Sequence, residues 1–84
     1  MPVPKAIHHP AYRALIACLR ARRVQLGWRQ QDLARRLELP RSWVTKVETA
    51  ERRLDILELC RLCRVLDVRV STVLDALVIA LDRP

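Results

Sequence analysis

Apolar residues recur every three or four positions along most of the chain, which is the spacing of one face of an α-helix. The pattern predicts a first helix over residues 10–26, with Pro10 at its first position and Gly27, the sole glycine, at its end. Four further periodic segments predict helices over about 29–37, 40–49, 55–66 and 70–81. Because the chain is rich in Leu, Ala and Arg and has no Phe, helices are favoured over β-hairpins. The sequence therefore predicts an all-α fold of five helices.

The length of 84 residues fits one small domain. Residues 1–8 are expected to form a flexible, proline-containing tail and residues 9–84 the domain. The longest apolar run, residues 76–81, is far shorter than the roughly 20 residues needed to cross a bilayer. With no targeting signal either, we expect a cytoplasmic, nucleoid-associated protein without a membrane partner.

The charge balance bears on the function of the protein. Sixteen basic and nine acidic residues give a net charge of +7, and all but two of the basic residues, Lys5 and Lys46, are arginines. Guanidinium groups match phosphate oxygens and guanine edges in a bidentate way. Double-stranded DNA is therefore the expected partner, and a merely solvated basic surface is the alternative.

The three cysteines suggest no chemistry of their own. Cys60 and Cys63 form a CxxC motif, but it lies inside a helical pattern, and a structural zinc site needs four ligands. The two histidines, His8 and His9, lie in or beside the tail. Catalytic triads and Gly-rich phosphate loops are also missing from the sequence. We therefore expect no enzyme activity, no metal, no cofactor and no small-molecule ligand, with thiols serving as small apolar groups.

Two short predicted helices, 29–37 and 40–49, are separated by a turn of three or four residues, as in a helix-turn-helix. The second presents Val44 and Val47 inward. Its other faces carry hydrogen-bonding side chains, namely Arg41, Ser42, Thr45 and Lys46.

Three segments carry a family resemblance: RVQLGWRQQDLARRL at 23–37, PRSWVTKVE at 40–48, and ERRLDILEL at 51–59 followed by LDV at 66–68. In order and spacing they resemble the lambda-repressor and Cro-like helix-turn-helix family over about two-thirds of the chain. Within it the chain is most similar to small stand-alone regulators of phages, mobile elements and restriction-modification systems. The sequence departs from the family at Glu38 and Ala50, where glycine is usual, and at Arg29, where Ser, Thr or Asn usually caps the helix.

The resemblance implies a role for each polar residue of the motif. Base readout is expected from Arg41, Ser42, Thr45 and Lys46. Phosphate contacts are expected from Gln30, Gln31, Trp43, Arg52 and Arg53. For Trp43 a half-buried place at the rim of the core is the competing interpretation. Glu48 shares the apolar stripe of its helix, and because a buried carboxylate needs a cation, the resemblance pairs it with Arg23.

The predicted fifth helix is apolar on nearly every side, so a partner should cover part of it. The simplest partner is a second copy, with an interface over residues 70–82 that includes Leu74, Leu77, Val78 and Leu81. The sequence thus predicts a homodimeric regulator, a repressor or autoregulator of prokaryotic or phage type that reads a palindromic operator through the major groove. The alternative is an antitoxin-like or antirepressor-binding module whose fifth helix docks a different, regulatory protein.

Overall fold

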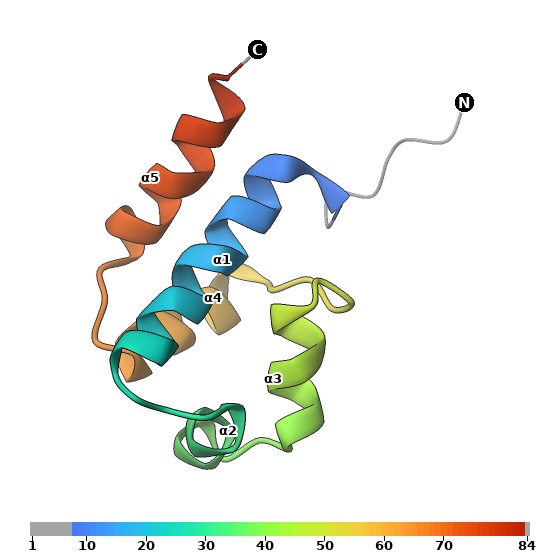
Figure 1. The fold of residues 1–84 in the computed structure, drawn as a ribbon, viewed down its shortest axis with the longest axis vertical. Helices are drawn as coiled ribbons and strands as arrows, with labels where there is room; N and C mark the ends of the chain where they lie inside the picture. The colour runs from blue at the N-terminus through green and yellow to red at the C-terminus, as the bar shows by residue number, and fades with distance from the viewer. Residues whose placement is uncertain (1–7, 84) are drawn as a thin grey trace.

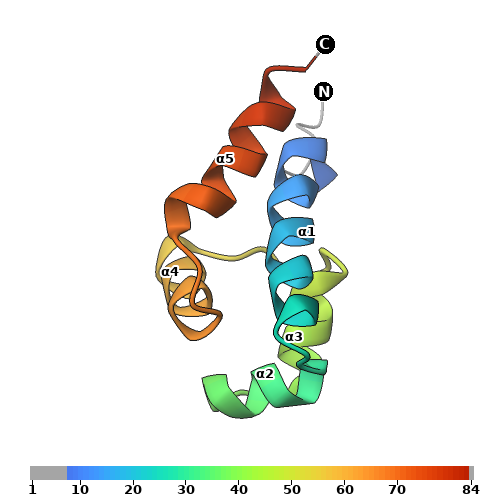
Figure 2. The same cartoon turned by 60° about the vertical axis from the view of Figure 1, so that its left-hand side comes forward.

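The computed structural model describes residues 8–83. Over this range the chain forms five α-helices and no strand: α1 Pro10–Gln25, α2 Gln30–Leu37, α3 Arg41–Glu48, α4 Ile56–Val65 and α5 Val70–Leu81. Helices α2 and α3 form one end of the molecule, α4 lies behind α1, and α5 runs alongside α1 (Figures 1 and 2). The predicted all-α, five-helix fold is confirmed. No helix between residues 8 and 83 is long and apolar enough to span a bilayer.

Local capping groups set where the helices begin. His9 caps α1, since its Nδ1 accepts a hydrogen bond from the Ala11 N–H at 3.0 Å. Asp55 and Glu58 form a reciprocal capping box at α4, with bonds of 2.8 and 2.9 Å. Pro40 precedes α3 as its N-cap, one residue before the helix, and not as its first residue as predicted.

Four turn residues adopt left-handed backbone conformations. Gly27 has φ 77°, while Glu38, Ala50 and Asp67 have φ values of 58°, 59° and 52°. Glu38 and Ala50 are the two positions where the resembling family has glycine, so the turns keep their geometry at a conformational cost. That cost is on the order of 1–3 kcal/mol for each non-glycine residue.

All five helices contribute to one core. Among the described residues, the buried members of this cluster are Leu15, Ile16, Leu19, Leu33, Ala34, Leu37, Val44, Val47, Leu62, Cys63, Leu66 and Val73. Val73 is the single fully buried residue of α5. One face of α5 therefore packs against the core and α1, and the other face stays exposed.

Candidate nucleic-acid interface

The outer face of α3 carries polar side chains that reach solvent. Val44 and Val47 are buried in the core. On the other side of the helix Arg41, Ser42 and Lys46 are exposed, and Thr45 is half-buried. An α-helix fits the major groove of B-DNA, and this face of α3 is free to enter it.

Thr49 extends this face and was missed by the sequence prediction. It is exposed at the C-cap of α3, and its hydroxyl donates to the Thr45 carbonyl at 2.9 Å. The spacing from Ser42 to Thr45 to Thr49, three and then four residues, is the signal that could have revealed it.

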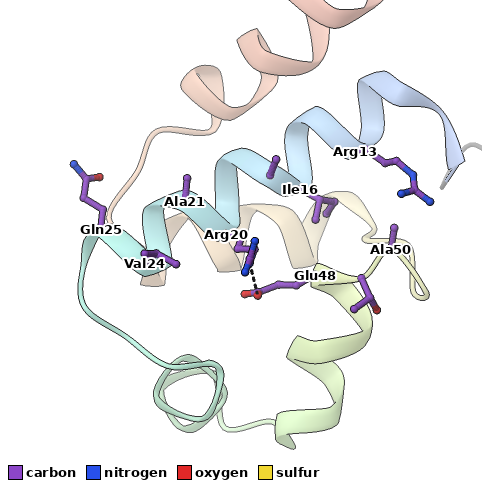
Figure 3. Close-up of a pocket in the computed structure, with 10 residues that line it drawn as sticks. Arg13, Ile16, Arg20, Ala21, Val24, Gln25, Glu48 and Ala50 are labelled. Atoms are coloured by element: carbon purple, nitrogen blue, oxygen red, sulfur yellow. Dashed lines mark ion pairs between the residues drawn. The ribbon is translucent and has the colours of Figure 1, made fainter.

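A bidentate ion pair ties α3 to α1. Arg23 donates to both carboxylate oxygens of Glu48, at 2.7 and 2.9 Å, and the two side chains are only 9% and 7% exposed. Arg23 also donates to the Trp28 carbonyl at 2.6 Å. The exposed Arg20 points to the same carboxylate, with Nε 3.9 Å from Oε1 (Figure 3). The structure thus brings together the two residues that the resemblance paired.

Gln30, at the start of α2, binds α3 directly. Its amide nitrogen donates to Glu48 Oε1 at 3.1 Å, and its amide oxygen accepts from the Thr45 hydroxyl at 2.9 Å. The side chain expected at a phosphate is therefore half-buried between two residues of α3. The backbone N–H groups at the start of α2 and the exposed Gln31 are the groups that this helix end offers to an anion.

Trp43 and Arg52, two of the residues predicted to contact phosphate, also make contacts within the protein. Trp43 is half-buried at the edge of the core. The Arg52 guanidinium lies 5.3 Å from its ring centroid and 2.7 Å from the Glu58 carboxylate. This arrangement favours the rim interpretation of Trp43. Of the two arginines expected to contact the backbone from the α3–α4 loop, Arg53 is the exposed one.

The Arg52–Glu58 pair predicts an acid-dependent loss of stability. The hydrogen bond from Arg52, followed by the one from the Asp55 N–H, lowers the pKa of Glu58 below its ordinary value of 4.5. Glu58 therefore contributes stability that is fully present above pH 4.5 and is lost as pH falls through the lowered, folded-state pKa. Glu58→Gln should be less stable than the wild type at neutral pH, and the gap should close below pH 4.5. Urea unfolding of both proteins between neutral pH and below pH 4.5 measures this difference in unfolding free energy. A difference that does not change with pH would contradict the contribution assigned to the Glu58 carboxylate.

Two other arginines stabilise the fold. Arg22 donates to the Leu66 and Asp67 carbonyls at 2.8 and 3.2 Å, and Arg61 donates to the Leu37 carbonyl. Each satisfies the carboxyl end of a neighbouring helix, which has carbonyls without intrahelical partners. The basic excess is therefore only partly available to a polyanion.

The three cysteines are free thiols that differ in exposure. Cys60 is exposed, Cys18 is intermediate and Cys63 is buried, and all three are free. Burial raises the pKa of the Cys63 thiol above its ordinary value. Within residues 8–83 no group of three or more His, Cys, Asp or Glu side chains could hold a metal ion.

Comparison with known proteins identifies the family. A family model described as a helix-turn-helix domain matches residues 14–77. The solved structure of an XRE-family like protein from Pseudomonas syringae pv. tomato str. DC3000 is 39% identical, with a TM-score of 0.79, and the match covers 94% of this chain and 95% of that chain. The chain belongs to the XRE-type helix-turn-helix family. No curated protein matches it.

Membership of the XRE-type family confirms the resemblance drawn from the motifs and supports a DNA-binding regulator. Its fold is typically that of a non-enzymatic protein. The matched range reaches from α1 into α5, so it includes the exposed face of α3 and the Arg23–Glu48 pair.

One face of α5 leaves an apolar stripe uncovered in this XRE-type protein. Leu74, Val78 and Leu81 follow one another at intervals of four and three residues and are 39%, 48% and 53% exposed. Leu77, also predicted for the interface, is half-buried and packs against the core. We call Leu74, Val78 and Leu81 the α5 stripe.

Proposed function

We propose that this XRE-type protein is a sequence-specific transcriptional regulator, a repressor or autoregulator, that inserts α3 into the major groove of its operator. The observation that carries the proposal is the exposed polar face at the start of α3, where Arg41 and Ser42 lie. In helix-turn-helix proteins the first residues of the second motif helix contact base edges. An Arg41 fork fits guanine O6 and N7, and Lys46 reaches a guanine or a phosphate.

We further propose that the regulator is a homodimer on a palindromic operator. The α5 stripe supports this because three large apolar side chains gather on one side of a short helix, outside the core. A two-fold dimer would place two copies of α3 about 34–36 Å apart on one side of the duplex.

Selection of bound DNA from a random pool tests both proposals. The expected result is an inverted repeat whose half-sites are centred about one helical turn apart. Enrichment of a single, asymmetric half-site would refute the dimer, and no enrichment would refute sequence-specific binding.

Substitutions at Arg41 and Arg53 should separate base readout from backbone contact. Arg41→Ala should weaken specific binding by about 1–3 kcal/mol and relax base preference at one position of each half-site. Arg53→Ala should weaken binding to all sequences alike and reduce the slope of log K against log salt by about one. Titration of selected and scrambled duplexes at several salt concentrations measures both effects. Uniform losses from both variants would show that α3 does not lie in the groove as proposed.

A second candidate function is docking of a different protein. Ile56 and Leu57, in the first turn of α4, are 78% and 80% exposed and lie outside the α5 stripe. Size-exclusion chromatography with light scattering distinguishes the two candidates. A soluble homodimer supports the regulator, while a monomer that becomes soluble only with a co-expressed neighbour supports the docking module.

A further inference from the structure

The hydroxyl of Thr45 differs from the other polar groups on the face of α3, because its single proton is already committed. Oγ1 donates to the Gln30 amide oxygen at 2.9 Å. Its second neighbour, the Arg41 carbonyl oxygen at 3.2 Å, is also an acceptor. A hydroxyl has one donor and two acceptor lone pairs. Toward a bound ligand Thr45 therefore presents lone pairs and its methyl group, but no proton.

The buried ion pair sets the direction of these hydrogen bonds. A carboxylate only accepts, so the Gln30 amide must turn its nitrogen toward Glu48, 3.1 Å away, and its oxygen toward Thr45. Glu48 is in turn held by the two hydrogen bonds from Arg23. The chain of polar contacts from Arg23 through Glu48 and Gln30 thus fixes the polarity of Thr45.

We propose that Thr45 is a specificity-determining residue that selects a base with an exocyclic amino group. The inference rests on the proposed binding of α3 in the major groove. There, adenine N6 and cytosine N4 are donors, whereas guanine O6 and thymine O4 are acceptors. An amino group satisfies the lone pairs of Thr45. A carbonyl oxygen would face those lone pairs with no proton between them, so guanine and thymine are disfavoured at the position that Thr45 contacts.

Ser42 provides the internal contrast. It is exposed on the same face and has no hydrogen-bond partner among residues 8–83, so its hydroxyl is free to donate or to accept. Ser42 should therefore tolerate both donor and acceptor edges, although it carries the same functional group as Thr45.

The test compares sites selected from a random DNA pool by the wild type, Thr45→Val and Ser42→Ala. Valine keeps the shape and one methyl of threonine but removes the acceptor. The wild type should prefer adenine or cytosine at one position of each half-site, and only Thr45→Val should lose that preference. At that position the amino group is then deleted chemically, with purine in place of adenine or 2-pyrimidinone in place of cytosine. The wild type should lose about 3- to 10-fold more affinity than Thr45→Val on this deletion, as one hydrogen bond predicts.

A third variant tests the part assigned to Gln30. Gln30→Met removes the amide that takes the Thr45 proton, and it should allow guanine or thymine at the same position. Circular dichroism confirms that each variant is folded. A Gln30→Met profile identical to that of the wild type would overturn the role of Gln30. A wild-type preference for guanine or thymine, or a profile unchanged by Thr45→Val, would overturn the role of Thr45 while leaving the proposed function intact. A wild type that selects no sequence would overturn both.

Discussion

Glu48→Ala should destabilise the domain by about 3–5 kcal/mol, because it leaves the Arg23 guanidinium buried without its counter-ion. The Arg23 side chain is 9% exposed, and the substitution removes both of its hydrogen bonds to the carboxylate. Domains have total unfolding free energies of only about 5–15 kcal/mol, so this loss is a large fraction of the total. Urea unfolding followed by circular dichroism measures the loss.

A double-mutant cycle with Arg23→Ala isolates the pair. The sum of the two single losses in unfolding free energy should exceed the loss measured for the double variant. The reason is that the second substitution removes a side chain whose partner is already gone. Arg20→Ala is the matched control: this guanidinium faces the same carboxylate at 3.9 Å, but its side chain is 65% exposed. Its effect should stay within about 1 kcal/mol, as for other surface pairs. Additive losses at Arg23 and Glu48 would show that the pair is not coupled.

The features predictable from the sequence were those encoded locally. The starts of α1 and α4 could be predicted because Pro10 and the Asp55–Glu58 capping box act within one turn of the helix N-terminus. The left-handed turns at Glu38 and Ala50 could be located only because the resemblance marks these positions, since neither residue type prefers that conformation. The partner of Glu48 could be sought because Glu48 is a carboxylate on an apolar stripe, and a buried carboxylate needs a cation nearby.

The features that escaped prediction depend on contacts between distant parts of the chain. Arg22 binds carbonyls 44 and 45 residues away, and Arg61 binds one 24 residues away. A count of positive charges cannot distinguish such an arginine from one that awaits a phosphate. Arg52 shows the same difficulty over a shorter distance, because its partner Glu58 also serves as a capping residue. The hydrogen bond from Thr45 to Gln30 likewise depends on the angle between α2 and α3, which local sequence patterns do not reveal.

The largest expected effect on function is at the α5 stripe, where Val78→Asp should convert the proposed dimer into a monomer at micromolar concentration. Val78 is 48% exposed in the single chain, so the aspartate stays hydrated in the monomer and α5 can remain helical. In the dimer the same charge would be buried without a partner, which costs several kcal/mol. Leu77 would be a poor choice for this test, because it packs against the core and its substitution would also destabilise the fold. Sedimentation equilibrium measures the change in mass, and circular dichroism checks the fold.

Ile79→Asp is the matched control for this prediction, because it introduces the same charge at the next residue of the same helix. Ile79 is 57% exposed, but it lies about 100° further round α5, outside the α5 stripe. Ile79→Asp should therefore stay dimeric and bind the operator, whereas Val78→Asp should lose tight operator binding. Val78→Asp should keep weak, salt-sensitive binding to any DNA, since each monomer retains the exposed basic residues around α3. Dissociation by both variants would mean that the charge acts without regard to position, and persistence of the dimer in Val78→Asp would place the interface away from the α5 stripe.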